Sequence, residues 1–255
     1  MNKMDKDDRS YLMENARVGC SLGLSDFSHL DSNVGILNYI RIANDISRQF
    51  SSGHILDWGC GFGQMAYLLQ RRGLNVTPFS IGTPDKVDLP INKNLNIVYS
   101  LDRTNLPFEN GSFGAVLSCG VLEHVEEGGG NEDRSLQEIY RLLSQCGKFF
   151  IYQLPQKYTW QEMICRCFKL GYTHPRRYTL KEIKIKLDKN GFQILRAKRF
   201  NLIPKNLTGM PRCIKHSYNQ IGHYLIDLDK IICAIPLLNQ FAGVLEITAV
   251  RRCDV

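Results

Sequence analysis

The sequence lacks the features that mark membrane-spanning, secreted and repetitive proteins. Its longest stretch without charged residues, Ile231–Leu245, is interrupted by Pro236 and is too short to span a bilayer. The first residues are rich in charge and hold no apolar segment of the kind found in secretory signal peptides. We find no internal repeat and no long low-complexity segment. We therefore expect a globular protein of the cytoplasm.

A metal-binding cysteine pattern is also missing. The nine cysteines are an odd number and are scattered along the chain. Cys165 and Cys167 are the only close pair, and no other residues complete a zinc-ligand spacing around them. We therefore expect no metal site, and thiols that stay reduced as they do in a reducing compartment.

What is present is an ordinary globular composition with an uneven charge. The 255 residues can bury one sizeable core, and 44% of them are hydrophobic. Residues 1–155 carry 14 Lys and Arg against 18 Asp and Glu, whereas residues 156–255 carry 18 against 7. The basic half is either a solvated face or a surface for an anionic partner, such as a phosphorylated substrate, an acidic membrane or nucleic acid.

Residues 54–155 alternate short apolar runs with helical patterns. We expect strands at 54–59, 74–81, 95–101, 113–125 and 148–155, with helices at 63–73 and 134–147. Strands separated by helices imply parallel βαβ units with right-handed crossovers. The pattern therefore predicts a doubly wound α/β sheet with helices on both faces.

The flanking segments complete one structural domain. Residues 1–53 read as an N-terminal helical cap, and residues 156–255 read as further helices with a final antiparallel strand pair at 192–200 and 243–252. Between those two strands lies a basic insertion, residues 201–242, which is too long for a plain hairpin loop. One helical face is expected there, made by Ile221, Leu225, Leu228 and Ile232.

Three alternate glycines follow the first predicted strand. Gly59, Gly61 and Gly63 come directly after Asp57, at the edge of the sheet where ligands bind in open parallel folds. Glycine allows a sharp turn and a close approach to a ligand. A dinucleotide fingerprint would place its third glycine one residue later, where the chain has Gln64. The turn alone leaves the kind of nucleotide ligand open.

Further motifs resemble those of class I S-adenosylmethionine (SAM)-dependent methyltransferases. The turn reads D-x-G-x-G-x-G, and the stretch "LDRTNLPFENGSFGAVLSCGVLEHV" carries the family's L-P-F and L-E-H-V segments. "RLLSQCGKFFIYQLP" resembles its helix end and fifth strand, with Gln145 and Cys146 where Lys-Pro is usual. The resemblance covers about residues 54–155. It implies a seven-stranded Rossmann-like sheet, five parallel strands plus a C-terminal antiparallel pair, and SAM as the cofactor.

The resemblance also assigns cofactor contacts. Asp57 and the backbone of the three glycines would hold the methionine end of SAM, because a carboxylate accepts hydrogen bonds from an ammonium group. Asp102 matches the family's contact to the adenine amino group. The full set implied is Asp57, Gly59, Cys60, Gly61, Gly63, Ser80, Asp102, Arg103, Asn105, Leu106 and Cys119.

The sequence departs from the family at the ribose contact. Ser80 stands where the family has an acidic residue at the end of its second strand, and a serine offers only a neutral, shorter group. Asp85, in the next loop, is a candidate to supply the missing charge. The segment after Ser80 has no helical periodicity, so we expect a truncated second helix. Gly114 replaces the aspartate of an S-F-D motif, a change that we interpret as structural.

Methyl transfer depends mainly on the positioning of an in-line nucleophile, with a base for a poorly ionised acceptor. His124 is a candidate base, and its alternative role is to order the loop; His174 is a second candidate. The acceptor pocket would have an aromatic wall and an anion clamp. The alternative for these residues is packing of a lid helix under a basic surface. The candidates are Gln153, Tyr158, Trp160, Arg176, Arg177 and Tyr178.

The sequence therefore predicts methyl transfer from SAM to a small-molecule, saccharide or lipid-like acceptor, with anionic acceptors included. Lys205, Arg212 and Lys215 flank the insertion and suit peripheral contact with an anionic membrane. One alternative is a SAM-fold protein that binds a ligand or partner without catalysis. Another is nucleic-acid methylation, which rests only on the basic half, since the chain has no N-P-P-Y motif and no recognisable RNA-binding module.

Overall fold

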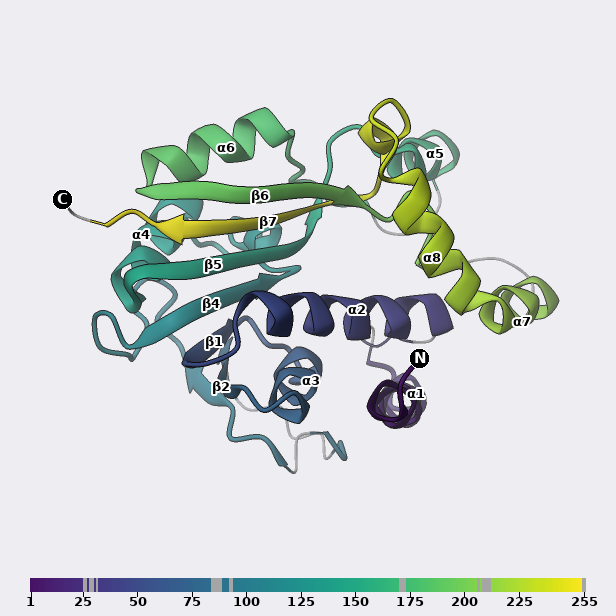
Figure 1. Cartoon of the computed structure of the whole chain (residues 1–255), viewed down its shortest axis with the longest axis horizontal. Helices are drawn as coiled ribbons and strands as arrows, with labels where there is room; N and C mark the ends of the chain where they lie inside the picture. The colour runs from purple at the N-terminus through teal and green to yellow at the C-terminus, as the bar shows by residue number, and fades with distance from the viewer. Residues whose placement is uncertain are drawn as a thin grey trace.

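The structure of the protein is a computed structural model. It describes residues 1–24, 27, 30, 32–83, 89–91, 94–169, 173–205, 207 and 212–253. Seven strands form one sheet in the order β3-β2-β1-β4-β5-β7-β6. Figure 1 shows the strands side by side, with α2 running along them. The strands are β1 (His54–Trp58), β2 (Asn75–Ile81), β3 (Val98–Ser100), β4 (Phe113–Cys119), β5 (Leu143–Pro155), β6 (Phe192–Phe200) and β7 (Val244–Arg251).

The strand directions confirm the predicted class of fold. β1 pairs in parallel with β2 and β4, β2 pairs in parallel with β3, and β4 pairs in parallel with β5. β7 lies antiparallel between β5 and β6. The sheet is therefore five parallel strands extended by a C-terminal antiparallel pair. This arrangement brings the carboxyl ends of β1, β4 and β5 to one edge of the molecule.

Helices cover both faces of the sheet. They are α1 (Lys3–Ser21), α2 (Asn33–Gln49), α3 (Gln64–Arg71), α4 (Glu132–Leu142), α5 (Trp160–Phe168), α6 (Leu180–Lys189), α7 (Arg212–Gln220) and α8 (Gly222–Ile232), with short 3-10 helices η3 (Leu122–His124) and η4 (Leu238–Phe241). Alternate side chains of β5 separate two cores: Phe150 packs with α1, α2 and α3, and Phe149 packs with α4 and α6. None of the helices in the described ranges is long and apolar enough to cross a membrane.

Several predicted boundaries were wrong, among them the start of the third strand, which is Val98 and not residue 95. The fourth strand ends at Cys119, because Gly120 adopts φ +70° and the chain turns into η3. The helix expected at 134–147 begins at Glu132 and ends at Leu142. The residues after it join β5, where the register moves from Phe113↔Leu143 to Ala115↔Lys148 and leaves a bulge. The buried apolar side chains of the helix also end at Leu142. The polar residues that follow made this boundary hard to recognise in the sequence.

The cysteine prediction was wrong for one pair. Cys146 and Cys253 form a disulfide, with their Cα atoms 5.6 Å apart. The bond joins the bulge of β5 to the chain just after β7. Since the two cysteines are 107 residues apart in sequence, only the pairing of β5 with β7 brings them together. The other seven cysteines form no disulfide.

The insertion holds α7, α8 and η4, and α7 and α8 lie beside α2. Ile226 of α8 packs with Val34 and Leu37 of α2, and Tyr218 and Leu225 pack against this small cluster. The prediction of one helical face was wrong in detail. Leu225 turns toward α2, whereas Ile221 and Leu228 remain about half exposed on α8. The helix therefore carries apolar side chains on more than its packed side.

Candidate functional site

The glycine turn after β1 is shaped by close contacts on both sides. Gly59, Gly61 and Gly63 have φ values of +73°, +55° and +88°, in the region that favours glycine. A Cβ on Gly59 would lie 2.6 Å from Val121, and one on Gly63 would lie 2.2 Å from Leu95. Among the described residues, a Cβ on Gly61 would meet no atom closer than 3.9 Å. Gly61 therefore presents bare backbone to open space, where a ligand can approach.

Asp57 supplies a buried carboxyl beneath this turn. Its side chain is 1% exposed at the end of β1, between β2 and β4. Burial raises the pKa of Asp57 to about 7, against a smaller lowering by the backbone N–H of Ala66 in α3. Oδ2 of Asp57 has no hydrogen-bond partner among the residues that the structure describes. Since buried polar atoms are nearly always paired, this oxygen suits the cationic group of a ligand.

Other buried polar atoms without a partner in the described part of the chain lie at the same strand ends. They are Ser118 Oγ at the end of β4, Glu123 Oε2 in η3 and Gln153 Nε2 near the end of β5. Each such atom costs free energy when it is removed from water without a hydrogen bond. Their gathering at the carboxyl ends of β1, β4 and β5 marks this edge as a site for a polar ligand.

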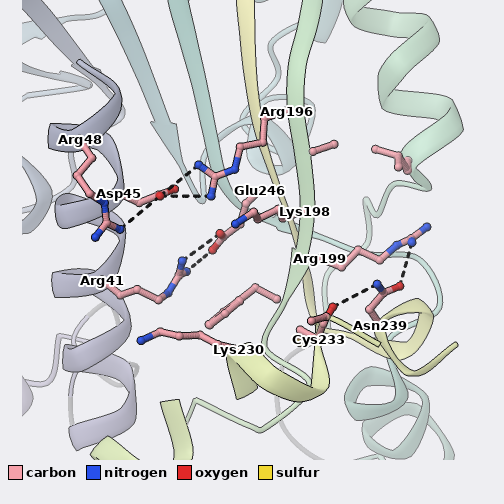
Figure 2. A pocket seen from close by; sticks show the side chains of 14 residues that line it. Arg41, Asp45, Arg48, Arg196, Lys198, Arg199, Lys230, Cys233, Asn239 and Glu246 are labelled. Carbon is pink, nitrogen blue, oxygen red and sulfur yellow. Dashed lines mark hydrogen bonds and ion pairs between the residues drawn. The ribbon is translucent and has the colours of Figure 1, made fainter. Parts of the chain in front are cut away.

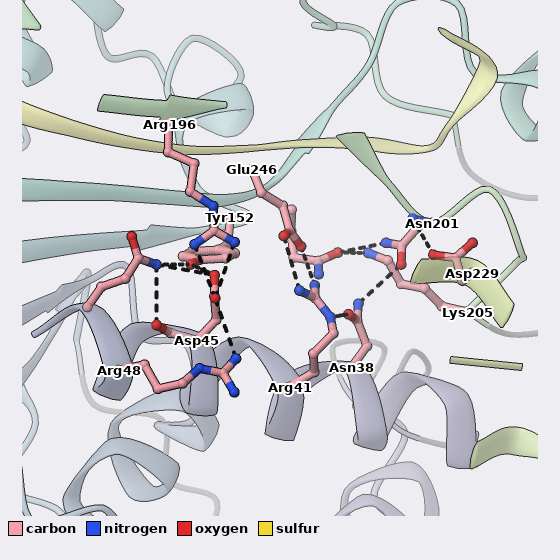
Figure 3. A network of polar contacts seen from close by, with 12 residues as sticks. Asn38, Arg41, Asp45, Arg48, Tyr152, Arg196, Asn201, Lys205, Asp229 and Glu246 are labelled. Carbon is pink, nitrogen blue, oxygen red and sulfur yellow. Dashed lines mark hydrogen bonds and ion pairs between the residues drawn. The ribbon is translucent and has the colours of Figure 1, made fainter. Parts of the chain in front are cut away.

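Gln153 is held in an unusual conformation at this edge. Its φ is +62°, and the register of β5 with β7 shifts between Ile151 and Leu154. Strained backbone of this kind is found mostly at functional sites. The side-chain oxygen of Gln153 accepts hydrogen bonds from Lys205 Nζ and, at 3.3 Å, from Asn201 Nδ2. Figure 3 shows Lys205 and Asn201 beside the Arg41–Glu246 ion pair.

Lys205 is a site residue that sequence analysis placed only in a basic insertion. Asn201 and Ile203 donate backbone hydrogen bonds to Asp229 of α8, which fixes the loop that carries the lysine. Burial lowers the pKa of Lys205 to about 8, while Cys119 and the carboxylates of Glu123 and Glu246 act in the opposite direction. At pH 7 the amine is therefore mostly protonated, and the minor neutral fraction, which grows toward pH 8, can take up a proton.

The predicted adenine and ribose contacts follow β2 and β3. Ser80 is half-buried and pairs with Tyr99 in the sheet. Asp85 lies outside the described residues. The Asp102 carboxylate accepts hydrogen bonds from the backbone and side chains of Thr104 and Asn105, at 2.8–3.1 Å. These bonds hold the pKa of Asp102 well below its usual range. Three of these donors bind Oδ1 and one binds Oδ2, so Oδ2 can still accept a hydrogen bond from an adenine amino group.

The remaining cofactor candidates differ in exposure. Leu106 is buried, and its N–H donates to Glu138 at 2.6 Å, whereas Arg103 and Asn105 are exposed. Burial and the Asp57 carboxylate both raise the pKa values of the Cys60 and Cys119 thiols. The two thiols therefore stay protonated and are not nucleophiles.

The two candidate histidines lie together although they are 50 positions apart. The rings of His124 and His174 have centroids 5.7 Å apart. Nδ1 of His124 is 3.1 Å from Glu127, and Nδ1 of His174 is 2.6 Å from Glu162. The structure thus places both beside η3, with one ring nitrogen of each at a carboxylate.

The predicted acceptor residues do not all reach the site. Trp160 donates its indole N–H to Leu202 at 2.8 Å and so holds the loop that carries Lys205. Tyr158 is exposed. Tyr178 is fully buried, and its hydroxyl donates to Glu132 at 2.7 Å. A side chain without exposed surface cannot contact an acceptor in this conformation, so Tyr178 is not carried into the proposed site.

Both predicted anion-binding arginines are engaged within the protein. Arg176 forms an ion pair with Glu132 at 2.7 Å and lies over the Tyr178 ring. Arg177 is 3.6 Å from Glu162 and donates to the carbonyl of Lys157. An anionic acceptor would have to compete with these carboxylates for either guanidinium.

A basic cavity of about 360 Å³ lies between α2, β6, β7 and α8 (Figure 2). Of the described residues that line it, two are acidic and both are paired: Glu246 with Arg41, and Asp45 with Arg196 at 3.2 Å. The cations along its wall outnumber them. They are Arg41, Arg48, Arg196, Lys198, Arg199 and Lys230.

Known proteins resemble the chain over this part. Residues 56–151 match the family model of a methyltransferase domain. The uncharacterized protein MJ0638 of Methanocaldococcus jannaschii is 28% identical over 182 residues, which are 71% of this chain and 72% of that protein. Sterol 4-C-methyltransferase strm-1 of Caenorhabditis elegans is 28% identical over 108 residues, which are 40% of this chain and 31% of that protein.

Solved structures share the fold. A SAM-dependent methyltransferase from Archaeoglobus fulgidus superposes with a TM-score of 0.55 at 17% identity, covering 84% of this chain and 93% of that one. The 1,6-didemethyltoxoflavin-N1-methyltransferase of Burkholderia thailandensis, with bound 1,6-didemethyltoxoflavin and S-adenosylhomocysteine, gives a TM-score of 0.52 at 16% identity. It covers 96% of this chain and 87% of that one.

The sheet order, the glycine turn and these matches define the class I methyltransferase fold. Residues 56–151 match a methyltransferase domain, and the chain has the fold of the SAM-dependent methyltransferases. Its cofactor is SAM. These three points confirm the predictions made from the motifs.

Proposed function

We propose that the protein transfers a methyl group from SAM to a lipid-like acceptor with an anionic head group, which it meets at a membrane surface. The observation that carries the proposal is an exposed apolar surface beside the site. On α8 it is a stripe with helical spacing, from Ile221 to Ile235, in which Tyr224 is 68% and Ile231 is 66% exposed. Such surfaces are rare on soluble monomers and are typical of contacts with lipid or protein.

Two further elements extend this surface. The exposed apolar side chains are Ile221, Tyr224, Leu228, Ile231 and Ile235 on or beside α8; Leu237, Leu238 and Phe241 at η4; and Met163, Ile164 and Phe168 on α5. We call this set the apolar surface. Gln156, just before α5, donates to the carbonyl of Gln240 in η4, so the two elements are neighbours.

The apolar surface is tied to the site through one loop. Trp160 and Gln161 of α5 bond to the carbonyls of Leu202 and Asn201, and Asp229 of α8 holds the same loop. Lys205 of this loop reaches Gln153 at the carboxyl end of β5. An acceptor whose tail lies along the apolar surface would therefore have its polar end near these residues.

Charge and relatedness support an anionic, lipid-like acceptor. The basic cavity shares Lys230, Cys233 and Asn239 with the α8–η4 segment, so positive charge lies beside the apolar surface. Cations next to apolar side chains are the combination that binds anionic membranes. The C. elegans relative is named as a sterol methyltransferase, which is also a lipid-modifying activity.

The residues present fit the cofactor. When bound, SAM supplies a methyl group activated as a sulfonium. Oδ2 of Asp57 would accept hydrogen bonds from the ammonium group, and the open backbone at Gly61 would let the ligand lie against the turn. Ser80, Asp102, Asn105 and Leu106 would contact the adenosine part from the ends of β2 and β3.

The chain contributes to transfer mainly by positioning. Gln153 and Lys205 would hold the polar end of the acceptor in line with the methyl group. Lys205 in its neutral form would remove the proton of an acceptor hydroxyl, since its lowered pKa lies near neutral pH. We therefore assign the role of base to Lys205 and not to His124, whose Nδ1 faces Glu127.

Transfer of labelled methyl from SAM would test the proposal. The protein is incubated with labelled SAM and with three fractions of a cell extract: lipid vesicles, water-soluble small molecules, and RNA. We expect label in the lipid fraction, with at least a tenfold loss in Asp57→Asn. Label confined to the water-soluble fraction or to RNA would overturn the lipid assignment and favour another acceptor class.

A further inference from the structure

Three side chains beside η3 bring possible metal ligands together. One atom each from Glu123, His124 and His174 lie within 4.8 Å of one another. Glu123 and His124 follow β4, and His174 comes from the segment between α5 and α6. The fold therefore assembles a set of two imidazoles and one carboxylate that has no compact spacing in the sequence.

The carboxylate of this set is buried and incompletely paired. Glu123 is 2% exposed, and its Oε2 has no hydrogen-bond partner within the described ranges. A buried carboxylate oxygen with no donor is costly unless a cation or a proton meets it. Lys205 and the two histidines are the cationic or ionisable groups that act on Glu123, and no direct bond from Lys205 to it is seen in this part of the chain.

Each histidine has a carboxylate behind it. Glu127 faces Nδ1 of His124 at 3.1 Å, and Glu162 faces Nδ1 of His174 at 2.6 Å. Histidines that bind metals commonly donate their second ring N–H to a carboxylate, which fixes the tautomer and the ring orientation. With Nδ1 at the carboxylate, Nε2 is the nitrogen that would coordinate an ion.

We propose that Glu123, His124 and His174 bind a divalent transition-metal ion, with Glu127 and Glu162 as the carboxylates that orient the two imidazoles. Two histidines and one glutamate are a ligand set that suits Zn²⁺ and leaves a coordination position open. The sequence analysis predicted no metal site because the cysteines lack a zinc-ligand spacing. That criterion cannot detect a site made of histidine and glutamate side chains.

The role of the ion rests on the proposed function. At the open position it would bind the acceptor hydroxyl and lower its pKa. The hydroxyl proton passes to Lys205, the acceptor oxygen forms a bond to the methyl carbon, and the sulfur–methyl bond breaks. The electron pair of that bond returns to sulfur, giving S-adenosylhomocysteine and the methylated acceptor.

Zinc binding by the full chain tests the site without any turnover. After removal of bound metal by a chelator, calorimetric titration with Zn²⁺ should show one ion per chain. Glu123→Gln and His174→Ala should each weaken Zn²⁺ binding by about a hundredfold or more. Glu162→Gln should weaken it by about 10- to 100-fold, as for other orienting carboxylates.

Controls separate this site from other ligands and from misfolding. His223→Ala removes an exposed histidine of α8, and Cys165→Ser/Cys167→Ser removes the close thiol pair; both should leave Zn²⁺ affinity unchanged. Circular dichroism and the melting temperature of the metal-free protein are measured for every variant and should match the wild type, which shows that each is folded. Absence of Zn²⁺ binding in the wild type, unchanged binding in His174→Ala, or loss in the cysteine variant would overturn the proposal. None of these results would bear on SAM binding or on label transfer to lipid.

Discussion

At the scale of single residues, Asp57 gives the sharpest prediction. Burial raises its pKa to about 7, so the carboxyl is largely protonated at pH 6 and largely ionised at pH 8. Only the ionised form can pair with the ammonium of SAM. SAM affinity should therefore rise with pH, by about tenfold per unit below pH 7, and level off above it. Calorimetric titration across this range measures the effect.

We expect this pH dependence to come from Asp57 itself and not from the groups that surround it. The thiols of Cys60 and Cys119 face it with raised pKa values, and Ala66 of α3 contributes only a backbone N–H. Asp57→Asn should lose the pH dependence and bind SAM roughly 10- to 100-fold more weakly, the worth of one charge-assisted hydrogen bond of about 1.5–3 kcal/mol. An unchanged affinity in a folded Asp57→Asn protein would contradict the assignment.

The same carboxyl links pH to the stability of the ligand-free protein. Its folded pKa lies above its ordinary value, so its contribution to stability is fully present when it is protonated in both states. That contribution is lost as the pH rises from its ordinary pKa toward 7. SAM binding should therefore raise the melting temperature most on the alkaline side of this range.

Ser80 gives a second prediction at this scale. Its place at the end of β2, paired with Tyr99, is where the family has an acidic residue. Ser80→Asp should therefore bind SAM as tightly as the wild type or more tightly, because a carboxylate can accept from both ribose hydroxyls. Loss of SAM binding in a folded Ser80→Asp protein would show that the loop after β2 differs from the family's.

The sequence was sufficient to predict those site residues that are adjacent in the chain and form a recognisable motif. Asp57 and its glycines could be placed because a strand, a turn and a carboxylate follow one another directly. Lys205 could not, because its role depends on the loop that Asp229 and Trp160 hold against β5. Nor could the +62° conformation of Gln153, which depends on the register of β5 with β7.

At the scale of elements, α8 tests the membrane contact. Leu228 and Ile231 are 46% and 66% exposed, so Leu228→Asp/Ile231→Asp should change stability little. Co-sedimentation with vesicles that contain anionic lipid should fall by about tenfold or more in this variant. Ile185→Asp, on the exposed side of α6, is the matched control and should bind as the wild type does. Equal losses in both variants would contradict a specific role for the apolar surface.

The disulfide gives a prediction that concerns β5 and β7. Cys146 and Cys253 close a loop with a sequence separation of 107, and cross-links of this kind stabilise folded proteins by about 2–4 kcal/mol. Reduction, or Cys146→Ser, should lower the free energy of unfolding by that order in denaturant titrations. Identical unfolding curves with and without reductant would show that the two thiols are not joined in solution.

Element boundaries were predictable only where local signals were unambiguous. The capping box of Thr179 and Glu182 is such a signal, and α6 begins directly after Thr179. By contrast, residues 143–147 carry no strand alternation, and they enter β5 only because Leu143 pairs with Phe113 across the sheet. The apolar residues of α8 had helical spacing, but their division between α2 and solvent depends on how the insertion docks.

At the scale of the whole molecule, the charge asymmetry of the sequence has a structural counterpart. The glycine turn and Asp57 lie in the acidic half, while the apolar surface and most of the basic cavity come from the basic half. The two halves meet at the carboxyl edge of β5, where Gln153 bonds Lys205. Cofactor and acceptor would therefore approach this edge from different segments of one domain.

A crystal structure of the complex with S-adenosylhomocysteine tests this central claim most directly. The account predicts the ligand across the glycine turn, with its amino group within hydrogen-bond distance of Asp57 Oδ2 and its sulfur toward Gln153 and Lys205. A ligand bound elsewhere, as in the basic cavity beside Arg41, or a bound ligand that leaves Asp57 Oδ2 without a partner, would contradict it.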